Sequence, residues 1–298
     1  MRLHHTTIFQ GVATALITPF REDRIDRDAL SRLIEWQIQG GVDAILVAGT
    51  TGESSTLSFA EHGELISLAK EMIRGRLPLL AGCGSNCTLR ARELARIACD
   101  AGADALLAVT PYYNKASDTG ILLHYEAVAK AASRPLIVYN VPARTGVQLG
   151  MKHYRELAKI DGVAGVKEAS GDLSLLEELC AEWGDRLDVY TGNDDQTVAA
   201  ARLGASGVIS VCSNAYPRAM AELCRACISK NWQDADRQIQ FLRPLMKALF
   251  WEVNPIPVKY LSHRLGLCEE IYRLPMCPPS EDTKKRLDAV FEQYREWI

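Results

Sequence analysis

The sequence lacks the long apolar run that a membrane-spanning helix needs. None of its hydrophobic segments approaches the roughly 18 residues that such a helix requires, and the first residues, MRLHHTTIFQG, contain no apolar core of a secretory signal. Blocks of like charge are also missing, because 34 Lys and Arg oppose 37 Asp and Glu and give a net charge of −3. This balance provides no basic footprint for nucleic acid. We therefore expect a cytoplasmic protein whose partners are small molecules, with no nucleic acid and no membrane among them.

A disulfide framework is missing as well. The nine cysteines are odd in number and are scattered from Cys83 to Cys277, which fits reduced thiols in a reducing compartment. Cys224 and Cys227 form a lone CxxC, but they lie in a segment of helical periodicity that has no second ligand pair. We therefore expect core packing there and no metal site, and we interpret CGSNC, which contains Cys83 and Cys87, in the same way.

Short apolar runs alternate with helical segments along the 298 residues, of which 48% are hydrophobic. Buried runs separated by amphipathic helices are typical of a parallel sheet with helical crossovers. Eight of them in about 220 residues predict a (β/α)8 TIM barrel, a fold of roughly 250 residues. A doubly wound open sheet is the alternative, but no glycine fingerprint follows the first run. The runs begin at Gly11, Asp43, Leu77, Asp104, Pro135, Gly162, Leu187 and Gly207.

Helix signals between the runs support this organisation. DRDALSRLIEWQIQGG has apolar residues at helical spacing and ends in two glycines, and TLRARELARIACDAGA follows the same pattern. The alternation stops after the eighth unit, and from about Ser229 onward all segments are helical. The sequence therefore predicts a catalytic barrel over residues 1–228 and a C-terminal helical region over residues 229–298.

In such a barrel the active site lies at the carboxyl ends of the strands, so polar residues there are candidates for catalysis. Only two of these candidates are cationic: Lys167, which ends the sixth run, and Arg144, which follows the fifth in YNVPARTG. The remaining candidates carry hydroxyl, amide or carboxylate groups; they are Thr50, Thr51, Glu53, Ser54, Thr110, Tyr112, Tyr113, Asn114, Tyr139, Asn140, Thr145, Glu168 and the segments TGNDD and SVCSN.

Lys167 is the residue with the most specific chemistry. A free lysine has a pKa near ~10.4 and is almost fully protonated at pH 7, whereas burial in an apolar barrel favours the neutral, nucleophilic amine. A neutral amine at the barrel mouth forms a Schiff base with a keto acid, and the imine then acts as an electron sink. The chemistry needs a proton shuttle, which Tyr139, Thr51 and Tyr113 can supply. It also needs a carboxylate anchor, for which the GTTG amides and Arg144 are suited.

Simpler interpretations of these residues remain open at this point. Lys167 ends its strand and can reach solvent, and Tyr139 can be a core tyrosine with a satisfied hydroxyl. Glu53, with Ser54, can serve as a helix cap, and the adjacent acidic residues of TGNDD, Asp194 and Asp195, are explained as caps of the helix that follows. The rival amine, Lys259 in NPIPVKY, lies beyond the eighth strand in a helix introduced by proline.

Taken together, the motifs identify a family. GTTGES, TPYYNK, YNVPARTG, GVKEASGD, TGNDD, GVISVCSN and NPIPVKY, in this order and at these spacings, resemble the dihydrodipicolinate synthase branch of the pyruvate-dependent, class I aldolase-like lyases. The resemblance covers the chain from Gly11 to its C-terminus. It implies a barrel with a C-terminal helical region, assembled as a homotetramer that is a dimer of tight dimers, and a reaction that uses no metal and no organic cofactor.

The resemblance also implies a reaction and roles for particular residues. Lys167 forms the Schiff base with pyruvate, and the enamine adds to aspartate 4-semialdehyde, which gives 4-hydroxy-tetrahydrodipicolinate on the route to diaminopimelate and lysine. Tyr139, Thr51 and Tyr113 form the proton relay, with Tyr113 reaching the neighbouring subunit's site. The implied substrate-binding residues are Thr50 and Thr51 for the pyruvate carboxylate, Arg144 for the carboxylate of the semialdehyde, and Gly192, Asn193 and Ile209 as the pocket lining.

Many members of this family are inhibited by lysine at the tight-dimer interface. The corresponding residues here are Ser54, Ser55, Phe59, His62, Asn86, Arg90 and Tyr112. Two of them depart from the lysine-sensitive pattern, because Phe59 replaces a histidine and Arg90 replaces the glutamate that binds the ammonium of the inhibitor. We therefore expect weak or absent inhibition by lysine. On its own, His62 is interpreted as an interface or helix-surface residue.

Related activities remain as alternatives. N-acetylneuraminate lyase and the 2-keto-3-deoxy sugar acid aldolases of the same family share the lysine, the tyrosine and a similar GTTGE loop. Arg144 in NVPARTG, together with NPIPVK, favours the synthase. A binding protein on an inactive barrel and a phosphate-binding barrel enzyme belong to other classes; the first is weakened by the complete set of amine, relay and anchor residues, the second by the lack of a basic group after the last two strands.

Overall fold

The computed structural model describes residues 7–297 and contains a closed barrel of eight parallel strands. In barrel order the strands are β1 (Gly11–Ala15), β4 (Ala44–Val47), β5 (Leu79–Gly82), β6 (Ala105–Val109), β7 (Leu136–Asn140), β8 (Val163–Glu168), β9 (Asp188–Thr191) and β10 (Gly207–Ser210), and β10 closes onto β1. Each strand lies in one of the eight predicted runs. The predicted TIM barrel is thus confirmed and the open sheet is excluded. The first residues of MRLHHTTIFQG, residues 1–6, lie outside the described residues.

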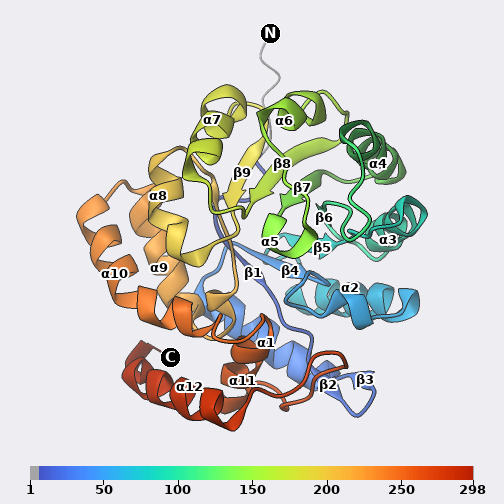
Figure 1. The fold of residues 1–298 in the computed structure, drawn as a ribbon. Helices are drawn as coiled ribbons and strands as arrows, with labels where there is room; N and C mark the ends of the chain where they lie inside the picture. Colours follow the sequence, from blue (N-terminus) through green and yellow to red (C-terminus); the bar gives the residue numbers. More distant parts are fainter. Residues whose placement is uncertain (1–6, 298) are drawn as a thin grey trace.

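Helices surround the barrel strands (Figure 1). They are α1 (Arg27–Gly40), α2 (Phe59–Ile73), α3 (Thr88–Asp100), α4 (Asp118–Ala131), α5 (Pro142–Thr145), α6 (Met151–Leu157), α7 (Leu173–Trp183), α8 (Thr197–Arg202) and α9 (Pro217–Ile228). The helix signals are borne out in α1: the Asp26 side chain accepts from the backbone N–H of Ala29, and Gly41 ends the helix with a left-handed φ of 78°.

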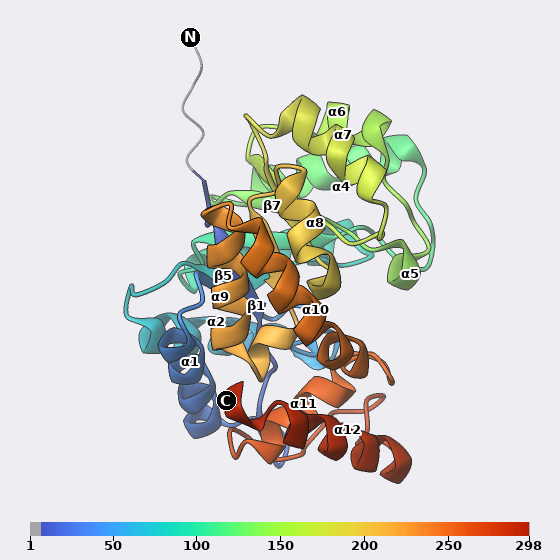
Figure 2. The ribbon, with the colours of Figure 1, turned by 90° about the vertical axis from the view of Figure 1, so that its left-hand side faces the viewer.

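After α9 the regular elements of the described chain are all helices, as expected. α10 (Trp232–Ala248) packs against α8 and α9, and α11 (Ile256–Arg264) contacts α12 (Glu281–Gln293). Figure 2 shows α11 and α12 together beyond the ring of barrel helices. A short hairpin, β2 (Phe20–Arg21) with β3 (Arg24–Ile25), follows β1 and was not predicted. Among the described residues, no helix has the length and apolar character needed to cross a bilayer.

Two apolar cores hold this arrangement together. The larger one fills the space between strands and helices, and its members include Cys224 and Cys227, which confirms that this CxxC serves packing. The smaller one fills the barrel interior with alternate strand residues such as Leu46, Leu107 and Ile209. Because successive strand residues point to opposite faces, one residue faces the interior and the next faces the helices. This alternation decides which polar side chains reach the barrel mouth.

Candidate active site

The side chain of Lys167 lies inside the barrel at the carboxyl end of β8. Tyr139 on β7 is its partner across the two strands, and the Nζ atom of Lys167 lies 4.4 Å from the centre of the Tyr139 ring. Both side chains are buried. The parallel register of β7 and β8 therefore places the candidate nucleophile beside the candidate proton carrier.

Burial changes the acid–base properties of both groups. It lowers the pKa of Lys167 to about 7, with the nearby Arg144 cation acting in the same direction and the carboxylate of Asp194 acting against it. Burial also raises the pKa of Tyr139 to about 12, against the effect of Arg144. About half of the amine is therefore neutral at pH 7, and the phenol keeps its proton. A neutral amine beside a protonated phenol suits imine formation.

The two groups line a small cavity of about 70 Å³. A single water molecule needs roughly 10–15 Å³ on the same measure, so the cavity suits a ligand of a few non-hydrogen atoms. The cavity lining includes these predicted site residues: Thr50, Thr51, Tyr139, Arg144, Lys167, Gly192 and Asn193. Ile209 is absent from this lining; it is fully buried in the barrel interior, and Val211 lines the cavity instead.

The two threonines of the loop after β4 have different partners. Thr50 lines the cavity beside Tyr139, and its side chain acts on the pKa of Tyr139 against the effect of burial, whereas the hydroxyl of Thr51 accepts a hydrogen bond of 3.0 Å from Nδ2 of Asn254. The structure thus connects Thr50 to the candidate relay and ties Thr51 to the segment before α11. Sequence reasoning assigned the relay hydroxyl to Thr51, because adjacent threonines cannot be told apart without the direction of each side chain.

Arg144 and Tyr113 are both exposed, but only Arg144 is part of the cavity. Arg144, in α5, donates to the backbone carbonyl of Asn254 at 3.3 Å and lies at the rim. Tyr113, in the loop after β6, is 85% exposed with a left-handed φ of 74°. Within one chain, then, the third member of the candidate relay is not joined to Tyr139. Asn254 is the first residue of the motif NPIPVKY, and its contacts to Thr51 and Arg144 leave no signal in that motif because they join distant segments.

Three sequence interpretations of nearby polar residues are corrected. Asp194 does not cap the following helix; its Oδ2 accepts from the backbone N–H groups of Val211 at 3.1 Å and Cys212 at 2.9 Å, so it joins the loops after β9 and β10. Glu53 does not cap α2, since its carboxylate pairs with Lys259 at 2.5 Å. His62 does not lie on a helix surface, because it is buried and its Nε2 is 2.7 Å from the carbonyl of Gly82.

The cap of α2 comes from residues further along the loop. The Ser58 hydroxyl accepts from the backbone N–H of Glu61, and the Glu61 carboxylate accepts from the backbone N–H of Ser58. This reciprocal pair satisfies two backbone donors at the helix start. Glu53 is therefore free to point away from α2 and toward the C-terminal helices. The position of Lys259, paired with Glu53 and fully buried, also removes it as a rival nucleophile for the cavity.

A second, larger cavity of about 450 Å³ adjoins the site. Most of the residues that correspond to the family's lysine site line it: Ser54, Ser55, Phe59, His62, Arg90 and Tyr112. Asn86 is exposed and is not part of the lining. The exposed Arg90 contributes a positive charge to this cavity. Over residues 7–297, no cluster of three or more His, Cys, Asp or Glu side chains has the arrangement of a metal site.

Comparisons with known proteins agree with this geometry. The sequence pattern of the Dihydrodipicolinate synthetase family matches residues 8–294. The 4-hydroxy-tetrahydrodipicolinate synthase of Geobacter sulfurreducens is 42% identical over 288 residues, which cover 97% of this chain and 99% of that protein. Among solved structures, the dihydrodipicolinate synthase of Aquifex aeolicus superposes with a TM-score of 0.94 at 40% identity and covers 96% of this chain and 98% of its own.

A further solved structure was determined in complex with pyruvate. The chloride-inhibited dihydrodipicolinate synthase of Acinetobacter baumannii, complexed with pyruvate, has a TM-score of 0.93 at 41% identity and covers 96% of this chain and 98% of its own. These similarities extend over nearly the whole length of both chains. They agree with the closed barrel described above. The chain therefore belongs to the dihydrodipicolinate synthetase family.

Proposed function

We propose that the chain condenses pyruvate with L-aspartate 4-semialdehyde to form 4-hydroxy-tetrahydrodipicolinate, with Lys167 as the Schiff-base nucleophile. The observation that carries the proposal is a buried amine with a pKa of about 7, 4.4 Å from the Tyr139 ring, in a cavity of about 70 Å³. Pyruvate has only six non-hydrogen atoms, which suits this volume. The relative from Acinetobacter baumannii, solved with pyruvate, supports the same substrate.

The proposed reaction proceeds through an imine and an enamine on Lys167. The amine of Lys167 adds to the keto carbon of pyruvate and water leaves, which forms the imine. Loss of a methyl proton gives the enamine, whose carbon attacks the aldehyde carbon of the second substrate. The amino group of that substrate then displaces Lys167 and closes the ring. Overall the two substrates combine with loss of one water, and the lysine is regenerated without a metal or an organic cofactor.

Proton transfer in these steps is assigned to Tyr139 and a threonine of the β4–α2 loop. The effect of the Thr50 side chain on the pKa of Tyr139 supports Thr50 as the second member of the relay, while Thr51 lines the cavity as a ligand for the pyruvate carboxylate. Arg144, at the rim of the cavity, is suited to bind the carboxylate of the semialdehyde as a bidentate partner. Gly192 and Asn193 also line this cavity.

Tyr113 completes the relay of a neighbouring subunit in this proposal, within a homotetramer built from tight dimers. Its support is the exposure of the side chain together with the strained left-handed backbone at this residue. Phe59, Leu89 and Leu123, on α2, α3 and α4, are also exposed, and a set of exposed apolar side chains suits an interface between subunits. We place the assembled enzyme in the cytoplasm, where its nine free thiols would stay reduced.

The experiment that tests the proposed function compares aldehyde partners. The protein is incubated with pyruvate and aspartate 4-semialdehyde, and the product is identified by mass spectrometry. We expect 4-hydroxy-tetrahydrodipicolinate from this pair, and little turnover when the semialdehyde is replaced by N-acetylmannosamine or by the aldehyde product of a 2-keto-3-deoxy sugar acid. Faster condensation with either of the other aldehydes would reassign the substrate within the family.

The rate of imine formation is expected to follow the protonation of Lys167. Because burial lowers its pKa to about 7, the reactive neutral form is lost as pH falls through 7. Below pH 6 the rate of adduct formation with pyruvate is therefore expected to fall about tenfold per pH unit, and above pH 8 to level off. Borohydride trapping at a series of pH values measures this profile. A rate that keeps rising to pH 10 would show an amine with the pKa of an ordinary lysine.

A methyl group at Gly192 is expected to displace the nucleophile. A Cβ atom built at this position lies 2.7 Å from Cε of Lys167 and 2.7 Å from Cβ of Ala169, closer than real contacts allow. Gly192→Ala should therefore slow pyruvate trapping by up to about 100-fold, the scale of a 1 Å misplacement. Gly150→Ala is the matched control, because nothing lies within 4 Å of a Cβ there. Equal trapping rates in the two variants would contradict the proposed path of the Lys167 side chain.

Lysine is expected to inhibit this enzyme weakly or not at all. The cavity of about 450 Å³ is lined by the cation Arg90 and the apolar side chain of Phe59. The ammonium group of a bound lysine would therefore meet a positive charge where lysine-sensitive members of the family have a carboxylate. Like charges at close range disfavour binding. Titration of the condensation reaction with lysine is the measurement, and half-inhibition at a sub-millimolar concentration would refute the expectation.

A further inference from the structure

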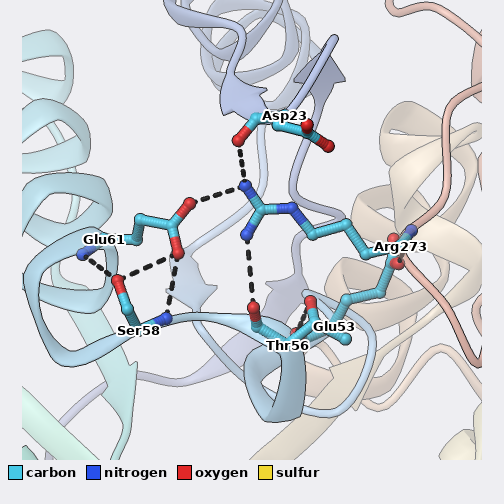
Figure 3. Close-up of polar contacts among 6 residues, drawn as sticks. All are labelled: Asp23, Glu53, Thr56, Ser58, Glu61 and Arg273. Carbon is cyan, nitrogen blue, oxygen red and sulfur yellow. Dashed lines mark hydrogen bonds and ion pairs between the residues drawn. The ribbon is translucent and has the colours of Figure 1, made fainter.

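One arginine of the C-terminal segment reaches the loop between β4 and α2. Arg273 lies between α11 and α12 in the sequence, and its side chain is 16% exposed. The guanidinium donates to the backbone carbonyls of Thr56 at 3.2 Å and Asp23 at 2.5 Å, and to the carboxylate of Glu61 at 2.5 Å. Figure 3 shows it between these acceptors, which come from the loop, the β2–β3 hairpin and α2.

Residues of the C-terminal region also contact the loop at Glu53 and Thr51. The backbone N–H of Arg273 donates to Oε2 of Glu53 at 3.2 Å, and Nζ of Lys259 pairs with the other oxygen of that carboxylate. Asn254 donates to the hydroxyl of Thr51. Contacts separated by more than 200 residues in the sequence therefore hold the loop at Thr51, Glu53 and Thr56.

The loop has a conformation that needs such support. Glu53 has a left-handed φ of 52°, a region that side chains other than glycine enter at an energetic cost. The segment that follows, Ser54–Thr56, forms a single short 3-10 turn. Such a conformation persists only when surrounding contacts determine it. The contacts of Glu53 to Lys259 and to the Arg273 backbone act directly on the strained residue.

Arg273 and Glu61 form an ion pair of opposite charges. A hydrogen bond from Arg273 is the main reason why the pKa of Glu61 is lowered to about 2. The carboxylate is therefore ionised through the neutral range. Three acceptors in different directions also suit the fork of a guanidinium better than the single ammonium of lysine.

We propose that Arg273 is a positioning residue for pyruvate: it holds the β4–α2 loop so that Thr50 stays beside Tyr139 and Thr51 stays at the cavity. The proposal rests on the proposed function, because it assumes that pyruvate reacts at Lys167. Arg273 itself lines neither the Lys167 cavity nor the larger cavity that adjoins it. Its effect is therefore expected on the binding of pyruvate through the loop, without direct contact to the substrate.

Two variants and one control test the proposal. R273Q removes both the positive charge and the planar guanidinium donors. R273K keeps the charge but replaces the guanidinium with a single ammonium group. R264Q removes a cation of the same C-terminal region whose ion pair, with Asp288, lies within α11 and α12. The measurements are the pyruvate concentration that gives half-maximal borohydride trapping at Lys167, and amide hydrogen exchange of residues 50–56.

In R273Q we expect the half-saturating pyruvate concentration to rise about tenfold, a smaller effect than the roughly 100-fold of a full 1 Å misplacement, together with faster exchange in the loop. R273K should lie between R273Q and the unaltered protein, and R264Q should match the unaltered protein. Should R273Q fail to fold, R273K supplies the measurement, with a rise of roughly threefold expected.

A merely structural role would give a different result. The trapped fraction at saturating pyruvate would then fall with the amount of folded protein, while half-saturation and loop exchange would stay unchanged; this would overturn the positioning role and leave the proposed function intact. An unaltered protein that forms no pyruvate adduct would instead refute the proposed function, and the positioning role would fall with it.

Discussion

Replacing Lys167 with alanine is expected to abolish the pyruvate adduct and to slow condensation by roughly 10⁴-fold or more, the scale seen when a nucleophile is removed. The reason is chemical, because the imine that serves as the electron sink needs an amine at this position. Lys167 is the amine that lines the cavity of about 70 Å³. Mass spectrometry after borohydride reduction with pyruvate measures the adduct, and steady-state kinetics measure the loss of turnover.

The matched control is Lys152→Ala. Lys152 lies on α6 in an exposed ion pair with Asp118, so its loss should leave both the adduct and the turnover close to those of the unaltered protein. An adduct that persists in the Lys167→Ala variant would place the reactive amine elsewhere. Peptide mapping of the adduct in the unaltered protein would then identify the lysine that carries it.

Replacing Lys259 with methionine is expected to lower the free energy of unfolding by about 3–5 kcal/mol. The side chains of Lys259 and Glu53 are 0% and 1% exposed, and their charged atoms lie 2.5 Å apart. Methionine has a similar volume, so the variant leaves the Glu53 carboxylate buried without its cationic partner. Urea unfolding followed by circular dichroism measures the change in stability.

Two controls isolate the electrostatic contribution. Lys152→Met removes a lysine whose ion pair is exposed, and it should change the stability by less than about 1 kcal/mol. The double variant K259M/E53Q should recover part of the loss, because a neutral amide is less costly to bury than an unpaired carboxylate. A Lys259→Met variant that unfolds at the same urea concentration as the unaltered protein would mean that the buried pair contributes nothing net.

The order of the strands and helices follows from local patterns in the sequence. A buried strand in a parallel barrel needs an apolar run, and each helix between strands needs an apolar stripe, so both leave a signal within ten to fifteen residues. Lys167 leaves a local signal of the same kind, because it is a charged residue at the end of an apolar run. The β2–β3 hairpin left no such signal, because each of its strands has only two residues.

The sequence by itself thus determined the barrel, the polar residues at its carboxyl end and the proposed nucleophile, Lys167. Only the tertiary structure decided that the side chain of Thr50 and not of Thr51 acts on the pKa of Tyr139, that Val211 and not Ile209 lines the cavity, and that Asp194 and Glu53 bind distant groups instead of capping nearby helices. The physical reason is that these choices depend on side-chain direction and on contacts between segments far apart in the chain. Glu53 meets Lys259 across 206 positions, and no local pattern records that contact.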